Sequence, residues 1–153
     1  MERQNPPFIV LVADDDEDDC MLVETAFQKT GITHHLHIVD DGQELLVFLH
    51  HAGDFVDPER HPRPNLILLD LNMPRLDGRK ALSIIKSDPQ LKDIPVLILT
   101  TSREKQDIEL TRQAGASSFL AKPDVFEDLT QMLEKFCTAV LDNPNIPFQV
   151  IGC

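Results

Sequence analysis

Short apolar runs alternate with longer, mixed stretches along the chain. Four of these runs are almost continuously hydrophobic, which is typical of strands that helices cover on both faces. A further run mixes histidine with apolar residues and has the length of a strand. The pattern predicts five strands, at 8–13, 34–39, 66–69, 94–99 and 117–121.

Each predicted strand is followed by a stretch with the boundary residues of a helix. The first helix, from about Asp18 to Lys29, has apolar residues on one side and ends at Gly31. The other helices begin at capping residues. These are Asp41 with Glu44, Asp77 with Gly78, Thr101 with Glu104 and Asp124 with Glu127. Strict alternation predicts an α/β fold, a doubly wound five-stranded parallel sheet with five helices and the flavodoxin-like strand order 2-1-3-4-5.

Polar groups follow four of the predicted strands at the position where each strand ends. They are Asp14 and Asp15 after the first strand, Asp70 after the third, Thr100 and Thr101 after the fourth, and Lys122 with Pro123 after the fifth. Each has an ordinary explanation alone, as a solvated acid, a helix cap or a surface lysine. The carboxyl ends of parallel strands share one edge, where ligands of such sheets bind, so the combination indicates a functional site.

The chemistry of this site follows from its charges. Clustered carboxylates raise one another's pKa unless a cation neutralises them. Oxygen ligands without histidine or cysteine favour Mg²⁺, which commonly takes one or two carboxylates and keeps several waters. A metal ion, a lysine and a hydroxyl around a remaining carboxylate form a clamp for a phosphoryl group. Because the sequence has no glycine-rich phosphate loop, we expect the phosphoryl group to be transferred to Asp70 itself.

These residues resemble the receiver domain of bacterial two-component response regulators. The matching pieces are Asp14-Asp15, the segment LILLDLNMP from Leu66 to Pro74 with Asp77-Gly78 after it, Thr100, and Lys122-Pro123. The resemblance covers residues 8–141 and leaves 142–153 as a short C-terminal tail without an output domain. The long loop at 52–65 and the segment IPVLILTTS look most like the response regulators of cyanobacterial phytochromes. The resemblance implies a signalling receiver, not an enzyme, in a phosphorelay with a phytochrome-like sensor histidine kinase.

The resemblance also implies how the acidic residues act. Asp70 would accept the phosphoryl group, Asp15 would bind Mg²⁺ directly, and Asp14 would act through a water molecule. Asn72 would give its backbone carbonyl to the metal. The first helix, near 20–27, would contribute to the choice of kinase.

A conformational switch is part of the same resemblance. Thr100, with Thr101 beside it, would bond the phosphoryl oxygen, and Lys122 would pair with it. Phe119 stands where the family places an aromatic switch residue, and a phenylalanine there would act by packing because it has no hydroxyl. The peptide bond between Lys122 and Pro123 is expected to be cis.

Length, net charge and cysteine content limit the kinds of partner and the cellular compartment that we expect for this chain. At 153 residues the chain is long enough for one domain with a sizeable core. A formal net charge of −12 argues against nucleic acid and membrane surfaces as partners. We expect neither a signal peptide nor a membrane-spanning segment. The three widely spaced cysteines suit reduced thiols, so a cytoplasmic location is expected.

The predicted fifth helix is more apolar than one sheet face requires. Phe126, Leu129, Leu133 and Phe136 follow a heptad-like spacing, and the tail beyond them is also apolar. One interpretation is a broad core helix. The other is a face made of the fourth helix, the fifth strand and the fifth helix that nothing else in this chain covers. A second copy would cover it by pairing these residues with their own counterparts.

Two other functions are compatible with this sequence. A receiver fold can act as an interaction module without phosphorylation, although an unused site has no reason to keep this combination of charges. A hydrolase of the phosphoaspartate type would need a second carboxylate two residues after Asp70, where this chain has Asn72. Phosphotransfer from acetyl phosphate would separate the three functions.

Overall fold

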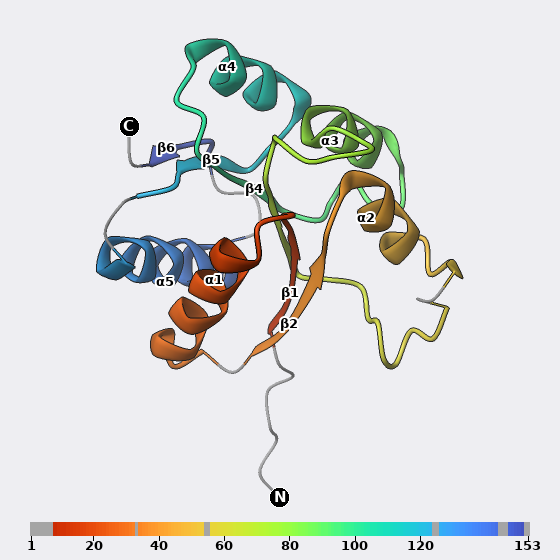
Figure 1. Ribbon diagram of the computed structural model, residues 1–153, viewed down its shortest axis with the longest axis horizontal. Coiled ribbons are helices and arrows are strands. Elements are labelled where there is room, and N and C mark those ends of the chain that lie inside the picture. Colours follow the sequence, from red (N-terminus) through yellow and green to blue (C-terminus); the bar gives the residue numbers. More distant parts are fainter. Residues whose placement is uncertain (1–7, 33, 54–55, 124–125, 144–146, 152–153) are drawn as a thin grey trace, which may run out of the picture.

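A parallel sheet with helices on both faces forms the body of the molecule (Figure 1). The computed structural model describes residues 8–32, 34–53, 56–123, 126–143 and 147–151. Its elements in chain order are β1 (Phe8–Ala13), α1 (Glu17–Thr30), β2 (His34–Val39), α2 (Gly42–Leu49), β3 (Leu66–Leu69), α3 (Gly78–Ser87), β4 (Val96–Thr100), α4 (Lys105–Ala114), β5 (Ser118–Ala121), α5 (Phe126–Asp142) and β6 (Val150–Ile151). The strands pair in the order β2-β1-β3-β4-β5-β6. The predicted fold class and the order of the first five strands are confirmed, and a short sixth strand is added.

The helices form two layers, with α1 and α5 on one face of the sheet and α2, α3 and α4 on the other (Figure 1). Under α1 and α5, buried side chains such as Phe27 and Leu133 pack against β1, β3, β4 and β5. Under the other three helices, residues such as Leu45 and Leu82 fill the second layer. Burial on both faces explains why the central strands are uninterrupted apolar runs.

Helix boundaries follow the predicted capping residues at α1, α2 and α3. Gly31 ends α1 in the left-handed conformation, with a φ of 75°. Asp41 caps α2 by accepting the Glu44 N–H at 2.7 Å, and Asp77 caps α3 by accepting the Arg79 N–H at 2.8 Å. The first three strands have the predicted bounds.

Two predictions of local structure near the site are wrong. The cap residue of α4 is Glu104, not Thr101, and the Glu104 side chain makes no capping hydrogen bond. In the loop before it, Ser102 Oγ donates to Asp107 in the first turn of the helix. The peptide bond before Pro123 is trans, since no cis bond occurs among the described residues. The trans form of such a bond is favoured by roughly 0.5–1 kcal/mol unless its surroundings select the other. The predicted cap at Asp124 lies outside the described residues.

The C-terminal tail returns to the sheet. In β6, Val150 pairs with Phe119 of β5, and the Phe119 N–H donates to the Gln149 carbonyl at 2.9 Å. The tail therefore covers the edge of β5. The expectation that nothing in the chain covers this side is wrong, because the two residues of β6 are too few to give a strand pattern in the sequence.

The inner face of α5 belongs to the core of the chain itself. Leu129, Leu133 and Phe136 are buried against α1 and the sheet, and Phe126 is half-buried beside them. Pairing of these residues with a second copy is therefore a wrong prediction, and the interpretation as a broad core helix is correct. The additional apolar side chains of α5 fill the space between α5 and α1. No helix in the described residues combines the length and hydropathy needed to cross a membrane.

Candidate functional site

Three carboxylates meet at the carboxyl edge of the sheet. Asp14 follows β1 and Asp70 follows β3, and the pairing of Ala13 with Leu69 brings the two strand ends together. Asp15 adds a third group, and one oxygen from each of the three side chains lies within 4.8 Å of the others. Asp14 is 4% exposed and Asp70 is 9% exposed, whereas Asp15 faces solvent.

Lys122, which follows β5, supplies positive charge to this acid cluster. Its Nζ lies 2.7 Å from Asp14 Oδ2, 2.7 Å from Asp19 Oδ2 and 3.6 Å from Asp70 Oδ2. Burial alone would lower the pKa of Lys122, but the hydrogen bonds to Asp14 and Asp19 and the nearby charges outweigh burial and raise it. Burial raises the pKa of Asp14 by more than the hydrogen bond from Lys122 lowers it. One ammonium shared among several acids leaves the cluster short of positive charge.

Local backbone bonds hold the two buried carboxylates in place. Asp14 Oδ1 accepts the Asp16 N–H at 3.0 Å, and Asp16 itself caps α1. Asp70 Oδ1 accepts the Asn72 N–H at 3.2 Å. In both residues one oxygen is bonded within its own loop, and the other is the oxygen nearer to Lys122.

The first turn of α3 comes very close to Asp70. A Cβ atom at Gly78 would lie 2.1 Å from the carbonyl oxygen of Asp70, a distance at which the backbone must move. The Gly78 N–H also donates to the Leu71 carbonyl at 3.0 Å. Glycine is therefore required at this position to keep α3 against the loop after β3.

The predicted hydroxyl and aromatic residues have different environments. Thr100 is fully buried at the end of β4, its Oγ1 accepts the Ser102 N–H at 3.3 Å, and its carbonyl accepts the Lys122 N–H at 2.8 Å. Thr101 is exposed. Phe119 is fully buried in the layer between the sheet and α2, α3 and α4. Of the two threonines, Thr100 is thus the one bonded to the strand end that carries Lys122.

The donor set of the acid cluster fits a hard divalent cation. Among the described residues, Asp14, Asp15 and Asp70 are the one group of acidic, histidine or cysteine side chains close enough to share a metal ion. All of their donors are oxygen atoms, and one of the residues is open to solvent, as Mg²⁺ prefers. A divalent cation would also supply the positive charge that the cluster lacks.

Two features of the structure were not predicted from the sequence: a second charged cluster around Asp107, and the bond from Lys122 to Asp19. Arg79 on α3 donates to both carboxylate oxygens of Asp107 on α4, at 2.7 and 2.9 Å, and Ser102 Oγ donates to Asp107 at 2.6 Å. The bond from Arg79 holds the pKa of Asp107 below its usual range despite burial. No sequence pattern joins two residues 28 positions apart on different helices. Asp19 lies in the first turn of α1, and the run of acidic residues that leads from the end of β1 into this turn was the available signal.

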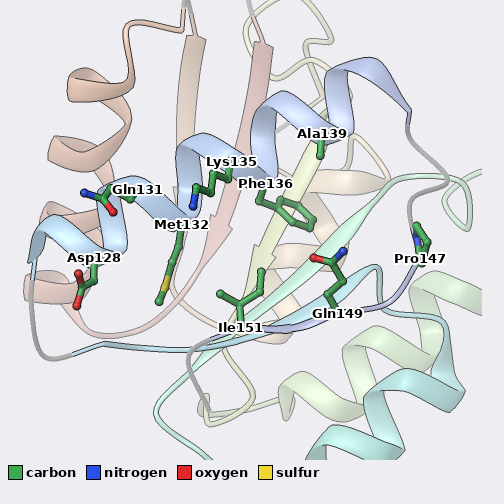
Figure 2. Close-up of a pocket in the computed structure, with 9 residues that line it drawn as sticks. All are labelled: Asp128, Gln131, Met132, Lys135, Phe136, Ala139, Pro147, Gln149 and Ile151. Carbon is green, nitrogen blue, oxygen red and sulfur yellow. The ribbon is translucent and has the colours of Figure 1, made fainter.

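A groove lies between α5 and the tail (Figure 2). Its volume is about 490 Å³, and none of the residues of the acid cluster line it. Met132 and Phe136 of α5 point towards the tail strand that carries Ile151, and Asp128 and Lys135 also line the groove (Figure 2).

Comparison with known proteins identifies the family. The response regulator receiver domain model matches residues 10–134. Response regulator Rcp1 of Synechocystis sp. is 37% identical over 146 residues, which cover 95% of this chain and 97% of Rcp1.

Solved structures give the same result. The Mn²⁺-bound form of Rcp1 matches with a TM-score of 0.80 and 37% identity, over 92% of this chain and 99% of that chain. The phosphorylated cyanobacterial phytochrome response regulator RcpA matches with a TM-score of 0.79 and 33% identity, over 86% of this chain and 91% of that chain. RPA3017, a response regulator in red light signalling of R. palustris, has a TM-score of 0.79, 32% identity and the same coverage. The chain therefore belongs to the response regulator receiver domain family and is related to the phytochrome response regulators.

Proposed function

We propose that Asp70 accepts a phosphoryl group from a sensor histidine kinase. The observation that carries this proposal is the environment of Asp70, a nearly buried carboxylate beside Asp14, Asp15 and the ammonium of Lys122. Membership of the receiver family supports the same role. The chain would assist its own phosphorylation and dephosphorylation but transform no separate substrate.

In the proposed transfer, one oxygen of Asp70 attacks the phosphorus, and the bond from phosphorus to the donor breaks with its electron pair leaving on the donor. Oδ2 is the attacking oxygen in this scheme, because Oδ1 accepts the Asn72 N–H. Lys122, 3.6 Å from Oδ2, would exchange its bonds to Asp14 and Asp19 for the new phosphoryl oxygens. Such a site accelerates transfer by positioning and by spreading negative charge.

Asp14, Asp15, Asp70 and the backbone carbonyl of Asn72 would hold Mg²⁺. When bound, the ion would neutralise the acids and the oxygens of an anionic donor. The relative Rcp1 has a Mn²⁺-bound form, which supports a divalent cation here. Transfer should therefore depend on the metal, because one lysine does not balance three carboxylates.

The proposed kinase is of the phytochrome type. RcpA is described as a phytochrome response regulator and RPA3017 as a response regulator in red light signalling. Helix α1 begins beside the acid cluster, and its Met21 and Leu22 expose apolar side chains that a partner would cover. We infer that the kinase docks on this side of the molecule.

Labelling by acetyl phosphate in the presence of Mg²⁺ tests the phosphoacceptor. Asp70→Asn should take no label. Asp57→Asn, a matched control in an exposed loop, should label as the wild type does. Wild-type labelling of Asp70→Asn would overturn the assignment. A wild-type chain that takes no label from acetyl phosphate or from a kinase would favour the interaction module that acts without phosphorylation.

We also propose a homodimer through the side formed by α4, β5 with β6, and α5. Leu110 on α4 and Val150 on β6 are exposed apolar residues, and the groove of Figure 2 lies beside β6. Sedimentation should show a dimer at tens of micromolar that Val150→Asp weakens. A wild type that stays monomeric with and without beryllofluoride would rule the dimer out.

A further inference from the structure

Helix α4 is held mainly by polar contacts. Its two buried residues are Asp107 and Thr111, while its apolar residues Ile108 and Ala114 are only partly buried. Thr111 Oγ1 bonds within the helix, to the Asp107 carbonyl at 2.8 Å. Asp107 is therefore the buried side chain that ties α4 to other elements by hydrogen bonds.

Through Ser102, hydrogen bonds connect Asp107 to the end of β4. Ser102 Oγ donates to Asp107 Oδ2 at 2.6 Å, and the Ser102 N–H donates to Thr100 Oγ1 at 3.3 Å. Ser102 thus bonds the carboxylate of α4 with its side chain and the hydroxyl of Thr100 with its backbone. Any rotation of the Thr100 hydroxyl towards Asp70 removes the acceptor from the Ser102 N–H.

Through Arg79 of α3, hydrogen bonds also connect Asp107 to the loop after β3. Arg79 holds both oxygens of Asp107, and its Nη1 lies 3.0 Å from Asp77 Oδ2 and 3.5 Å from the carbonyl of Leu71, the residue after Asp70. Arg79 also follows Gly78, whose backbone presses against Asp70. A displacement of this loop therefore reaches Arg79 directly.

We propose that Asp107 is a positioning residue that holds α4 in its unphosphorylated arrangement, through Ser102 on one side and Arg79 on the other. The inference rests on the proposed phosphorylation of Asp70. When the Thr100 hydroxyl turns to the phosphoryl oxygens, Ser102 loses the bond that its backbone makes to β4, and its hold on Asp107 weakens. Phosphorylation and the Asp107 contacts therefore oppose each other, and by linkage the loss of these contacts strengthens the binding of a phosphoryl mimic.

Asp107→Asn tests this inference, because it keeps the shape of the side chain and removes its charge. Backbone amides of 105–114 should exchange at least about tenfold faster in the unphosphorylated variant. The affinity for beryllofluoride with Mg²⁺ should rise about fivefold, at the low end of typical coupling between sites. Acetyl phosphate should still label Asp70.

Arg112→Gln is the matched control. It breaks the pair that Arg112 forms with Glu109, which is exposed and lies within α4. This pair connects α4 to no other element, so amide exchange and beryllofluoride affinity should match those of the wild type.

Ser102→Ala keeps the test decisive if Asp107→Asn fails to fold. It removes one hydroxyl and leaves the bonds from Arg79 in place, so the expected rise in affinity is smaller, about twofold, the low end for one hydrogen bond. Equilibrium binding of beryllofluoride is the readout, because it does not depend on how fast the phosphoryl group is lost.

The outcomes separate this inference from the proposed function. A wild type that binds beryllofluoride, together with an Asp107→Asn that has unchanged amide exchange in 105–114 or unchanged or weaker affinity, overturns the role of Asp107 and leaves the phosphoacceptor in place. A wild type that neither binds beryllofluoride nor takes label overturns the proposed function and the coupling with it.

Discussion

Two buried aspartates of this molecule, Asp14 and Asp107, have opposite electrostatic environments. Both are at most 6% exposed, and both contact a cation. Asp14 shares one ammonium with other acids, and burial raises its pKa. Asp107 has both oxygens bonded by the guanidinium of Arg79 and a further bond from Ser102, so its pKa is lowered.

This difference distinguishes the acid cluster, which is suited to chemistry, from the Asp107 contacts, which hold α4 in place. The acid cluster has more carboxylates than its one ammonium can neutralise, so it is receptive to a metal ion. The metal ion and Lys122 together can then pair with the oxygens of a phosphoryl group. The carboxylate of Asp107 is fully bonded and keeps one helix in place. The two regions meet at the first turn of α3, where Gly78 contacts Asp70 and the next residue, Arg79, binds Asp107.

Gly78→Ala should have the largest effect, because it disturbs both regions at once. The added Cβ would displace α3 from Asp70, and we expect the free energy of unfolding to fall by about 3 kcal/mol. Gly31→Ala is the control, since Gly31 has a φ of 75° but no atom within 4 Å of the added Cβ. It should cost about 1 kcal/mol. Urea unfolding measures both, and equal losses would show that the contact with Asp70 is not tight.

Asp107→Asn should lower the free energy of unfolding by about 2 kcal/mol at neutral pH. The folded-state pKa of Asp107 is depressed, so its stabilisation is present above the unfolded pKa and is lost as pH falls through the folded pKa. Urea unfolding at several pH values from 7 downward measures this effect. The difference in free energy of unfolding between wild type and variant should be clearly smaller at about pH 3 than at about pH 7. A difference that stays constant over this range would contradict the charged pair.

Lys122→Ala should weaken beryllofluoride binding at least about tenfold, which corresponds to about 1.4 kcal/mol. Among the residues that the structure describes, Lys122 is the cation paired with Asp70, and its loss leaves Asp14 buried without its ammonium. Conformational change on phosphorylation should be impaired as well. Lys92→Ala removes an exposed lysine of the same charge and should bind as the wild type does. Equal beryllofluoride affinity of Lys122→Ala and Lys92→Ala would show that Lys122 does not bind the phosphoryl group.

Asp14→Asn should have the smallest effect on stability and the opposite sign. Because the folded-state pKa of Asp14 is raised, its contribution favours the fold at low pH and is lost as pH rises through that pKa. In the presence of a chelator at neutral pH, the variant should be as stable as the wild type or up to about 1 kcal/mol more stable. Its Mg²⁺ affinity should fall. A clear loss of stability would show that Asp14 is as well satisfied as Asp107.

The acid cluster was predictable from sequence because its position depends on strand ends alone. A strand buried on both faces leaves an uninterrupted apolar run, and the first acid after that run marks the edge of the sheet. Asp14 and Asp70 could be found in this way, and the parallel topology then brings Lys122 to the same edge.

Other features depend on contacts that no local pattern encodes. The Arg79–Asp107 pair requires α3 and α4 to pack side by side, and the burial of Leu133 depends on the space between α1 and α5. The strand β6 has only two residues. For the same reason the sequence predicted an open face where the tail covers the edge of β5.

Direct location of the phosphoryl group is the most direct test of the central claim, that Asp70 is the phosphoacceptor. After incubation with acetyl phosphate and Mg²⁺, borohydride reduces an aspartyl phosphate to homoserine, and peptide mass spectrometry locates the product. We expect homoserine at position 70, and none when a chelator replaces Mg²⁺. Homoserine at Asp14 or Asp15 with aspartate retained at position 70 would contradict the account.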